Sequence, residues 1–141
     1  FIRKKSSLLI LSGYSFNDGH LNDTIINALK ANPTAMVLGL MYDCYENEGK
    51  ERYPEAYRLA KKQHNLNIWT FDKAIIGTNL GDWKKSQNSD DEDIDILSFI
   101  TSTKKAHTSD EHEVLVKLGD FSIFTNFLKK MIGTKKEEQN V

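Results

Sequence analysis

The sequence predicts an α/β fold, built as a partial Rossmann-like parallel sheet with flanking helices. Two observations carry this prediction. Apolar runs of strand length alternate with helical patterns along the first half of the chain, and this alternation is typical of parallel sheets with right-handed crossovers. The first two runs are also continuously apolar, as strands covered on both faces usually are. The 141 residues correspond to one ordinary domain.

Three strands are expected, at residues 6–12, 34–42 and 66–71. The first is centred on Leu8-Leu9-Ile10-Leu11, and the second is equally rich in aliphatic residues. A doubly wound sheet normally has more strands, and three alone would leave an exposed edge. The rest of the sheet is therefore expected to come from a segment upstream of Phe1.

Two helices are expected between these strands. The first follows Asp18, which is placed to cap it, and ends at Asn32-Pro33, because the residue before proline disfavours helical geometry. The second covers residues 53–63, with Pro54 tolerated in its first turn. The apolar residues of the first helix recur at helical spacing, at Leu21, Ile25, Ala28 and Leu29.

The chain is expected to divide into four parts. Residues 1–83 carry the alternating strands and helices, although residues 72–83 contain glycines and are expected to be irregular. Residues 84–112 form a polar insert that is expected to be mobile, because it has few apolar residues to bury. Residues 113–133 add a strand and a helix that complete the domain. Residues 134–141 are expected to be a solvated tail.

The C-terminal half is less regular than the first. Residues 94–100 fit either a short helix or a short strand, and residues 101–111 are expected to be a polar loop. The last helix is expected to start at Asp120 or Ser122, to stop at Gly133 and to pack its phenylalanines onto the sheet. Its apolar residues recur at helical spacing, at Phe121, Phe124, Phe127, Leu128, Met131 and Ile132.

The composition excludes several classes of protein. The formal net charge of −1 provides no field that attracts nucleic acid or anionic lipid, so no direct nucleic-acid binding is expected. No apolar run is long enough to span a membrane, and no signal peptide is visible. The single cysteine, Cys44, excludes an internal disulfide and fits a reducing compartment. A cytoplasmic protein without membrane contact is therefore expected.

A polar turn with a glycine joins the first strand to the first helix and is the best candidate for a binding site. Ligands of open α/β sheets bind where strands end and helices begin. Gly13 lets a phosphate or ribose approach the backbone closely, and the Ser15 hydroxyl can bond either group. A helix cap with ordinary turn residues is the alternative, and the spacing leaves both interpretations open. The candidate cofactor contacts are Gly13, Tyr14, Ser15, Phe16, Asp18, His20 and Asn22.

No metal site is expected. His107 and His112 lie near Asp110 and Glu111, but single residues of each type in one polar loop are a weak ligand pattern. His20 lies beside Asp18 at helical spacing, which favours a cap and a surface residue over a general base.

One stretch of the chain also resembles a known family. Residues 8–22, LLILSGYSFNDGHLN, are similar to the Gly-Tyr-Ser-Phe-x-Asp-x-His-hydrophobic-Asn signature of sirtuin-like domains of the bacterial anti-phage type. The similarity continues through the strands at residues 36–40 and 67–71. It includes Leu118-Gly119-Asp120-Phe121 and the later Phe127-Leu128 pair, and so covers most of the chain outside the polar insert.

The resemblance implies a Rossmann-like fold that binds NAD, with residues 1–83 as the C-terminal half of the NAD-binding domain. It implies that Gly13 and Ser15 contact the dinucleotide, and that the adenosine end lies near Tyr42 and Asp43. The glycine-rich phosphate loop and the catalytic asparagine and histidine of the family are absent from the sequence. No catalytic residue is therefore expected in this chain.

Three functions follow as alternatives. By resemblance, the full-length protein hydrolyses NAD to nicotinamide and ADP-ribose in anti-phage defence, as a homo-oligomer and with a nucleotide-driven partner such as a hexameric ATPase. The chain can instead be a sensor module that binds NAD or another nucleotide without turning it over. It can also be a structural assembly domain, in which case Met131 and Ile132 are the expected contacts.

Overall fold

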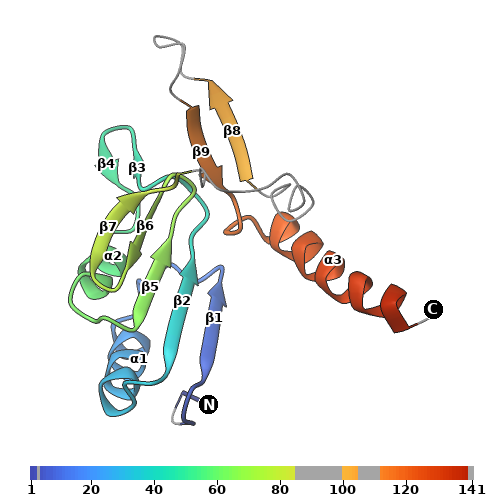
Figure 1. Ribbon diagram of the computed structural model, residues 1–141. Helices are drawn as coiled ribbons and strands as arrows, with labels where there is room; N and C mark the ends of the chain where they lie inside the picture. Colours follow the sequence, from blue (N-terminus) through green and yellow to red (C-terminus); the bar gives the residue numbers. More distant parts are fainter. Residues whose placement is uncertain (3, 85–99, 105–111, 140–141) are drawn as a thin grey trace.

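A five-stranded mixed sheet forms the body of the molecule, in the strand order β1-β2-β5-β6-β7 (Figure 1). The computed structural model describes residues 1–2, 4–84, 100–104 and 112–139. The predicted α/β fold, with a partial Rossmann-like sheet and flanking helices, is confirmed. The strands of this sheet are β1 Leu8–Ser12, β2 Met36–Leu40, β5 Leu66–Trp69, β6 Lys73–Ile76 and β7 Asn79–Asp82.

The strands β1, β2 and β5 are parallel, as the sequence pattern predicts. Leu9 pairs with Val37, and Val37 pairs with Leu66 on the next strand. Because side chains alternate along a strand, these three residues share one face of the sheet. Each strand is a few residues shorter than predicted, and the ends of elements are what a sequence pattern defines least well.

The helices α1 (Gly19–Ala31) and α2 (Pro54–Ala60) lie on the same side of the sheet (Figure 1). Asp18 caps α1 as predicted, because its carboxylate accepts a hydrogen bond of 3.1 Å from the Leu21 N–H. Asn32 is the C-cap, immediately before the proline that was expected to end the helix. The second helix has its proline in the first turn, as expected, and ends a few residues early.

The β6–β7 hairpin corrects the expectation that residues 72–83 are irregular. Ile76 pairs with Asn79 across a two-residue turn, Gly77-Thr78, whose φ angles are 54° and 72°. Positive φ at both central residues is the geometry of a type I′ turn, which matches the twist of the flanking strands. The two strands are short and partly polar, so they give no clear alternation in the sequence.

Two smaller hairpins lie outside the main sheet. The strand β3 (Glu46–Asn47) pairs with β4 (Lys50–Glu51), within a segment that has a polar sequence. The strand β8 (Ile100–Lys104) pairs with β9 (His112–Val116) in an antiparallel ladder. The strand expected before the last helix is therefore confirmed as β9.

The prediction of a polar loop at residues 101–111 is wrong for residues 101–104, which belong to β8. Polar threonines and a serine dominate that strand, so its sequence lacks the apolar alternation on which the prediction depended. Residues 85–99 and 105–111, with most of the expected polar insert and the side chains of His107, Asp110 and Glu111, lie outside the described residues.

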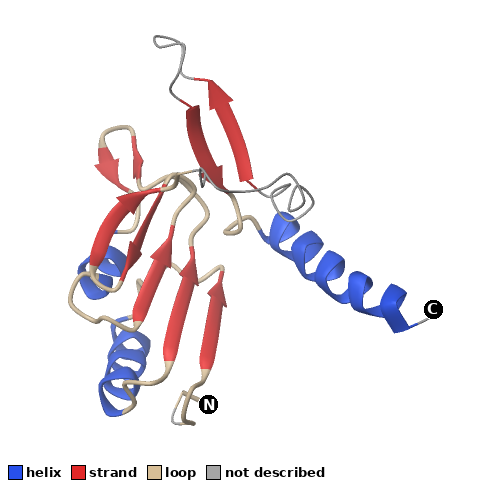
Figure 2. Ribbon diagram, viewed as in Figure 1, coloured by secondary structure: helices blue, strands red, loops and turns tan. Residues whose placement is uncertain are grey.

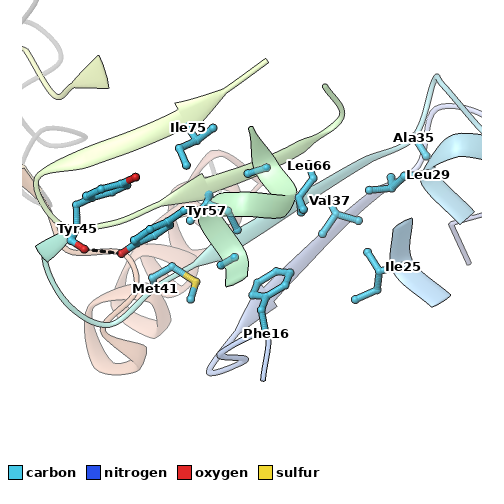
Figure 3. Close-up of a cluster of buried hydrophobic side chains, with 13 residues drawn as sticks. Phe16, Ile25, Leu29, Ala35, Val37, Met41, Tyr45, Tyr57, Leu66 and Ile75 are labelled. Atoms are coloured by element: carbon cyan, nitrogen blue, oxygen red, sulfur yellow. Dashed lines mark hydrogen bonds between the residues drawn. The ribbon is translucent and has the colours of Figure 1, made fainter. Parts of the chain in front are cut away.

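The hydrophobic core lies between one face of the sheet and the helices α1 and α2 (Figure 3). At one end of the core the Tyr45 and Tyr57 rings are stacked, with their centroids 4.0 Å apart. The Tyr57 hydroxyl donates a hydrogen bond of 2.8 Å to the Tyr45 carbonyl oxygen. The buried members of the core are Phe16, Ile25, Leu29, Ala35, Val37, Met41, Tyr45, Ala56, Tyr57, Ala60, Leu66, Ile68 and Ile75.

The helix α3 (Phe121–Gln139) starts beside the sheet and runs away from it (Figures 1 and 2). Asp120 caps it by accepting hydrogen bonds from the N–H groups of Ser122, at 2.9 Å, and Ile123, at 3.4 Å. The predicted stop at Gly133 is wrong, because the helix continues through it. A glycine inside a helix costs only about 1 kcal/mol relative to alanine, and no proline follows to end the helix.

Two further expectations about this helix need correction. The expected solvated tail at residues 134–141 is helical as far as Gln139. The phenylalanines do not all pack onto the sheet, since Phe121 is 70% exposed, whereas Phe124 and Phe127 are partly buried. Phe121 and Leu128 are seven residues apart and share one exposed side of the helix, whereas Phe124 and Phe127 lie on another side.

In the part of the chain that the structure describes, every helix is too short or too polar to cross a membrane.

Candidate functional site

The candidate loop, residues 13–18, follows the carboxyl end of β1 and leads into α1. Gly13 turns the chain with a φ of 79°, a conformation that suits glycine and strains residues with a side chain. A Cβ atom built on Gly13 has no atom within 4 Å. The space beside its backbone is thus open, as the approach of a phosphate or ribose requires.

A buried asparagine fixes the shape of the loop. Asn22, on the first turns of α1, is only 6% exposed. Its Nδ2 donates a hydrogen bond of 2.8 Å to the Phe16 carbonyl oxygen, and its Oδ1 accepts one of 2.6 Å from the Tyr14 hydroxyl. The predicted ligand contacts Tyr14 and Asn22 therefore bond to the loop itself.

Phe16 anchors the loop in the core. It has a φ of 61°, yet its side chain is only 1% exposed and lies among the core residues (Figure 3). Its ring packs against β2 at Gly39, where an added Cβ would lie 3.1 Å from a ring carbon of Phe16 and 2.7 Å from Cδ1 of Ile68. The positive φ is sustained because this burial and the bond from Asn22 hold the residue in place.

Asp18 and His20 occupy the entry to α1. The Asp18 carboxylate accepts from the backbone as a cap, which supports the alternative that the sequence left open for this residue. His20 is exposed on the first turn, where its carbonyl oxygen accepts a hydrogen bond of 3.0 Å from the Thr24 hydroxyl. Within the described residues, neither the Asp18 nor the His20 side chain forms a hydrogen bond with Ser15.

The Ser15 side chain is available to a ligand. It is partly exposed, and its hydroxyl forms no hydrogen bond with any residue in the described ranges. Its two neighbours, Tyr14 and Phe16, are turned into the fold and contact each other, with ring centroids 4.7 Å apart. The arrangement thus presents Gly13 and Ser15, while Tyr14, Phe16, Asp18 and Asn22 maintain the loop.

The Tyr14 hydroxyl is a poor candidate for a base. Burial raises its pKa, and the nearby negative charge of Asp18 raises it further. The phenol therefore stays protonated at neutral pH and acts as the hydrogen-bond donor to Asn22.

The neighbouring strand end was expected to lie near an adenosine group. Tyr42 follows β2 and is 62% exposed, with its ring edge-on to Phe71 at a centroid distance of 5.5 Å. The Asp43 carboxylate is already engaged, because it accepts hydrogen bonds from Cys44 N–H, at 2.7 Å, and from Arg52 Nε, at 3.2 Å. Tyr42 is thus more accessible to a ligand than Asp43 is.

The C-terminal segment returns to the same edge of the sheet. The Val116 N–H donates a hydrogen bond of 2.8 Å to the Phe71 carbonyl oxygen, just beyond β5. Gly119 lies directly on the backbone at the end of β2, where an added Cβ would come within 1.8 Å of the Met41 carbonyl oxygen. Residues 116–119 therefore cross the carboxyl ends of two of the three parallel strands.

This placement of Gly119 was not predicted from composition or spacing. The sequence does contain a signal for it, since a glycine directly before a helix-capping Asp120 fits a close approach of the backbone.

The described residues at this edge provide groups that can bind a ligand. Ser15 has no described base within hydrogen-bond distance that could take its proton, and the Tyr14 phenol is held in its protonated form. The described residues also contain no group of three or more His, Cys, Asp or Glu that could hold a metal ion. The open backbone at Gly13 and the Ser15 hydroxyl fit a phosphate or ribose.

A comparison with models of protein families finds no match to this chain, and a comparison with curated proteins finds none either.

Proposed function

We propose that this chain is the C-terminal part of a sirtuin-like domain that binds NAD and, in the full-length protein, hydrolyses it to nicotinamide and ADP-ribose in anti-phage defence. The proposal rests on one observation: some residues of the candidate loop hold its shape, and others are left open to a ligand. Tyr14, Phe16, Asp18 and Asn22 hold the loop, whereas Gly13 and Ser15 are left open at the carboxyl end of β1. That edge is where open α/β sheets bind nucleotides.

The reaction needs groups that the loop does not provide. Hydrolysis breaks the bond between C1′ of the ribose and the pyridinium nitrogen, and the electron pair of that bond neutralises the nicotinamide. A water oxygen forms the new bond to C1′ and gives up a proton to a base. Because the loop holds no base beside Ser15, we propose that another part of the full-length polypeptide supplies it. Gly13 and Ser15 then position the ribose and phosphate.

Nicotinamide release tests the enzymatic part of this proposal. The full-length protein, incubated with NAD under activating conditions, is expected to release nicotinamide, and the 141-residue chain alone is expected to release none. Chromatography of the reaction mixture measures both. A full-length protein that never releases nicotinamide, although NAD binds to it, would leave only the sensor function.

A serine substitution tests the site itself. Ser15→Ala is expected to weaken the binding of NAD to the full-length protein by about ten-fold, because one hydrogen bond to a charged or polar ligand group is lost. Ser7→Ala is the matched control, since Ser7 lies beside the opposite end of β1. Calorimetric titration gives both affinities. Equal affinities for the two variants would remove Ser15 from the site.

The alternatives make different predictions in the same assays. A sensor module binds NAD or ADP-ribose tightly and produces no nicotinamide. A structural assembly domain binds neither, and its subunits associate without ligand, which native mass spectrometry of the ligand-free protein measures. A hexameric ATPase partner belongs to the defence proposal and is expected only if the protein hydrolyses NAD.

A further inference from the structure

One face of the parallel strands is not covered by α1 or α2. Side chains alternate along each strand, so the neighbours of the core residues point to the opposite face. We call this the open face, and define it by Leu8 and Ile10 on β1 and Met36 and Leu38 on β2. Leu8 is 51% exposed, Ile10 is 40% exposed and Met36 is 43% exposed.

Such a surface is unusual for strands of this kind. Parallel sheets occur almost always with both faces covered, and soluble chains seldom leave contiguous apolar patches on a sheet in contact with water. The register places Leu8 beside Met36 and Ile10 beside Leu38, so the four side chains form one continuous patch.

The helix α3 has an exposed apolar stripe that could cover such a sheet face. Leu128, Met131 and Ile132 are spaced as i, i+3 and i+4, which puts them on one side of the helix. They are 43%, 48% and 58% exposed, respectively. Lys129 and Lys130 fall outside this apolar stripe. The molecule therefore has a sheet face that is exposed at Leu8, Ile10 and Met36 but buried at Leu40, which is 2% exposed. It also has a helix stripe whose side chains are about half exposed.

The start of α3 keeps these two surfaces of one chain apart. Gly119 is held against the backbone of Met41, and Asp120 caps the first turn, so the helix leaves from the carboxyl edge of the sheet. From there it diverges from β1, and its C-terminal end lies far from the strands (Figure 1).

We propose that two copies of this chain pair reciprocally, with the stripe of α3 from each copy lying on the open face of the other. The pairing is isologous, because each copy contributes the same two surfaces and a two-fold axis relates them. It covers the second face of the parallel strands with a helix, which is the arrangement that such strands require. This inference does not depend on NAD binding.

The exposed apolar area of the two surfaces supports pairing with a second copy of the chain. About half of each of the six large side chains is exposed, which is roughly 500 Å² of apolar surface in each copy. A stable interface buries about 800 Å² on each partner, of which a little over half is apolar. Neither surface alone supplies this apolar share, roughly 450 Å², whereas the reciprocal pair, in which each copy buries both surfaces, does.

The mass of the chain in solution tests the pairing. Light scattering at micromolar concentration is expected to give about twice 16.1 kDa. Ile10→Glu on the open face and Met131→Glu on the stripe are each expected to raise the dissociation constant at least ten-fold, because each buries an unpaired carboxylate. Leu80→Glu is the control, since Leu80 is similarly exposed, at 45%, but lies on the far edge strand β7.

Mixing the two variants distinguishes the reciprocal pair from other dimers. In a mixed dimer, the intact stripe of Ile10→Glu meets the intact face of Met131→Glu, so the mixture is expected to associate more tightly than either variant alone. Pairing through α3 alone would be lost only in Met131→Glu, and stacking of two open faces only in Ile10→Glu. Either result overturns the proposal, as does a chain that remains monomeric.

A loss of dimer in a variant must not come from loss of its fold. The substituted side chains are all exposed in the single chain, so circular dichroism is expected to show the same helix content for every variant. If the full-length polypeptide covers the open face with its own residues, that protein will be monomeric and Ile10→Glu will destabilise it, which also overturns the proposal.

Discussion

At the scale of single residues, Asn22 holds Tyr14 and Phe16 of the candidate loop in place. Its amide donates to the Phe16 carbonyl and accepts from the Tyr14 hydroxyl, so one buried side chain determines the position of the residue between them, Ser15. We therefore regard Asn22 as a positioning residue rather than a ligand contact. The same holds for Phe16, whose positive φ depends on its burial against Gly39.

The substitution Asn22→Ala is expected to lower the free energy of unfolding by about 2 kcal/mol. It leaves the Phe16 carbonyl and the Tyr14 hydroxyl without their partner, and unpaired buried polar groups are costly. Urea denaturation measures the effect. Asn27→Ala, at an exposed position of the same helix, is expected to change stability by less than about 0.5 kcal/mol. Equal effects for the two variants would contradict the role of Asn22.

At the scale of the elements, the chain after β9 is attached to the parallel sheet through a close backbone contact. The Val116 N–H binds the Phe71 carbonyl, and Gly119 then lies on the Met41 carbonyl with no room for a side chain. The start of α3 therefore depends on glycine at this position. Gly133, in the middle of the same helix, has nothing within 4 Å of an added Cβ.

The two glycines are expected to respond in opposite ways to alanine. Gly119→Ala should detach residues 116–121 from the sheet, because the new Cβ would overlap a backbone atom that cannot move aside. Gly133→Ala should stabilise the helix by up to about 1 kcal/mol. Amide hydrogen exchange distinguishes them. Protection of the first turn of α3 is expected to fall only in Gly119→Ala, with α1 unchanged, and loss of protection in neither variant would contradict the contact.

At the scale of the whole molecule, the buried Tyr57 makes the fold sensitive to alkali. Burial raises the pKa of the Tyr57 phenol, and the side chain is only 1% exposed. The folded state therefore holds this proton more tightly than the unfolded chain does. The resulting stability is fully present below the unfolded pKa, which is about 10, and is lost as the pH rises toward the folded pKa.

The substitution Tyr57→Phe separates the contribution of the hydrogen bond to Tyr45 from the pH-dependent contribution of the phenol. At pH 8 it is expected to lower the free energy of unfolding by about 1 kcal/mol, because the Tyr45 carbonyl loses its donor. Above pH 10 the wild-type chain is expected to lose up to about 1.4 kcal/mol more per pH unit than the variant does. Denaturation curves at several pH values measure both. Parallel pH profiles for the two proteins would show that Tyr57 ionises equally in both states.

The parts of this fold that could be predicted from the sequence are those with local causes. Continuous aliphatic runs predict β1 and β2, and the Asp18 and Asn32-Pro33 signals predict the limits of α1. The β6–β7 hairpin was not predicted because its strands are too short to show an alternation of apolar and polar residues. Its turn also needs a positive φ at Thr78 as well as at Gly77, and threonine does not indicate this conformation. The passage of α3 through Gly133 shows that one glycine is a weak stop.

The candidate site was predictable in position but not in the roles of its residues. The strand, turn and helix pattern places the loop at the sheet edge, and Asp18 was correctly recognised as a cap. The bond between Tyr14 and Asn22 could not be predicted, because it depends on how the turn folds back on the helix. The contact of Gly119 with Met41 joins residues far apart in the sequence, so no local pattern contains it.

The tight turn at Gly77-Thr78 also has a consequence for the order in which the chain folds. The strands β5, β6 and β7 are consecutive and joined by short connections, so their pairing closes small loops. The pairings of β2 with β5 and of β1 with β2 each need a crossover that contains a helix, and they close larger loops at a greater entropic cost. We expect the local meander to form first and to act as the template for β2 and then β1. The strand that carries the candidate binding loop is then the last to join the sheet.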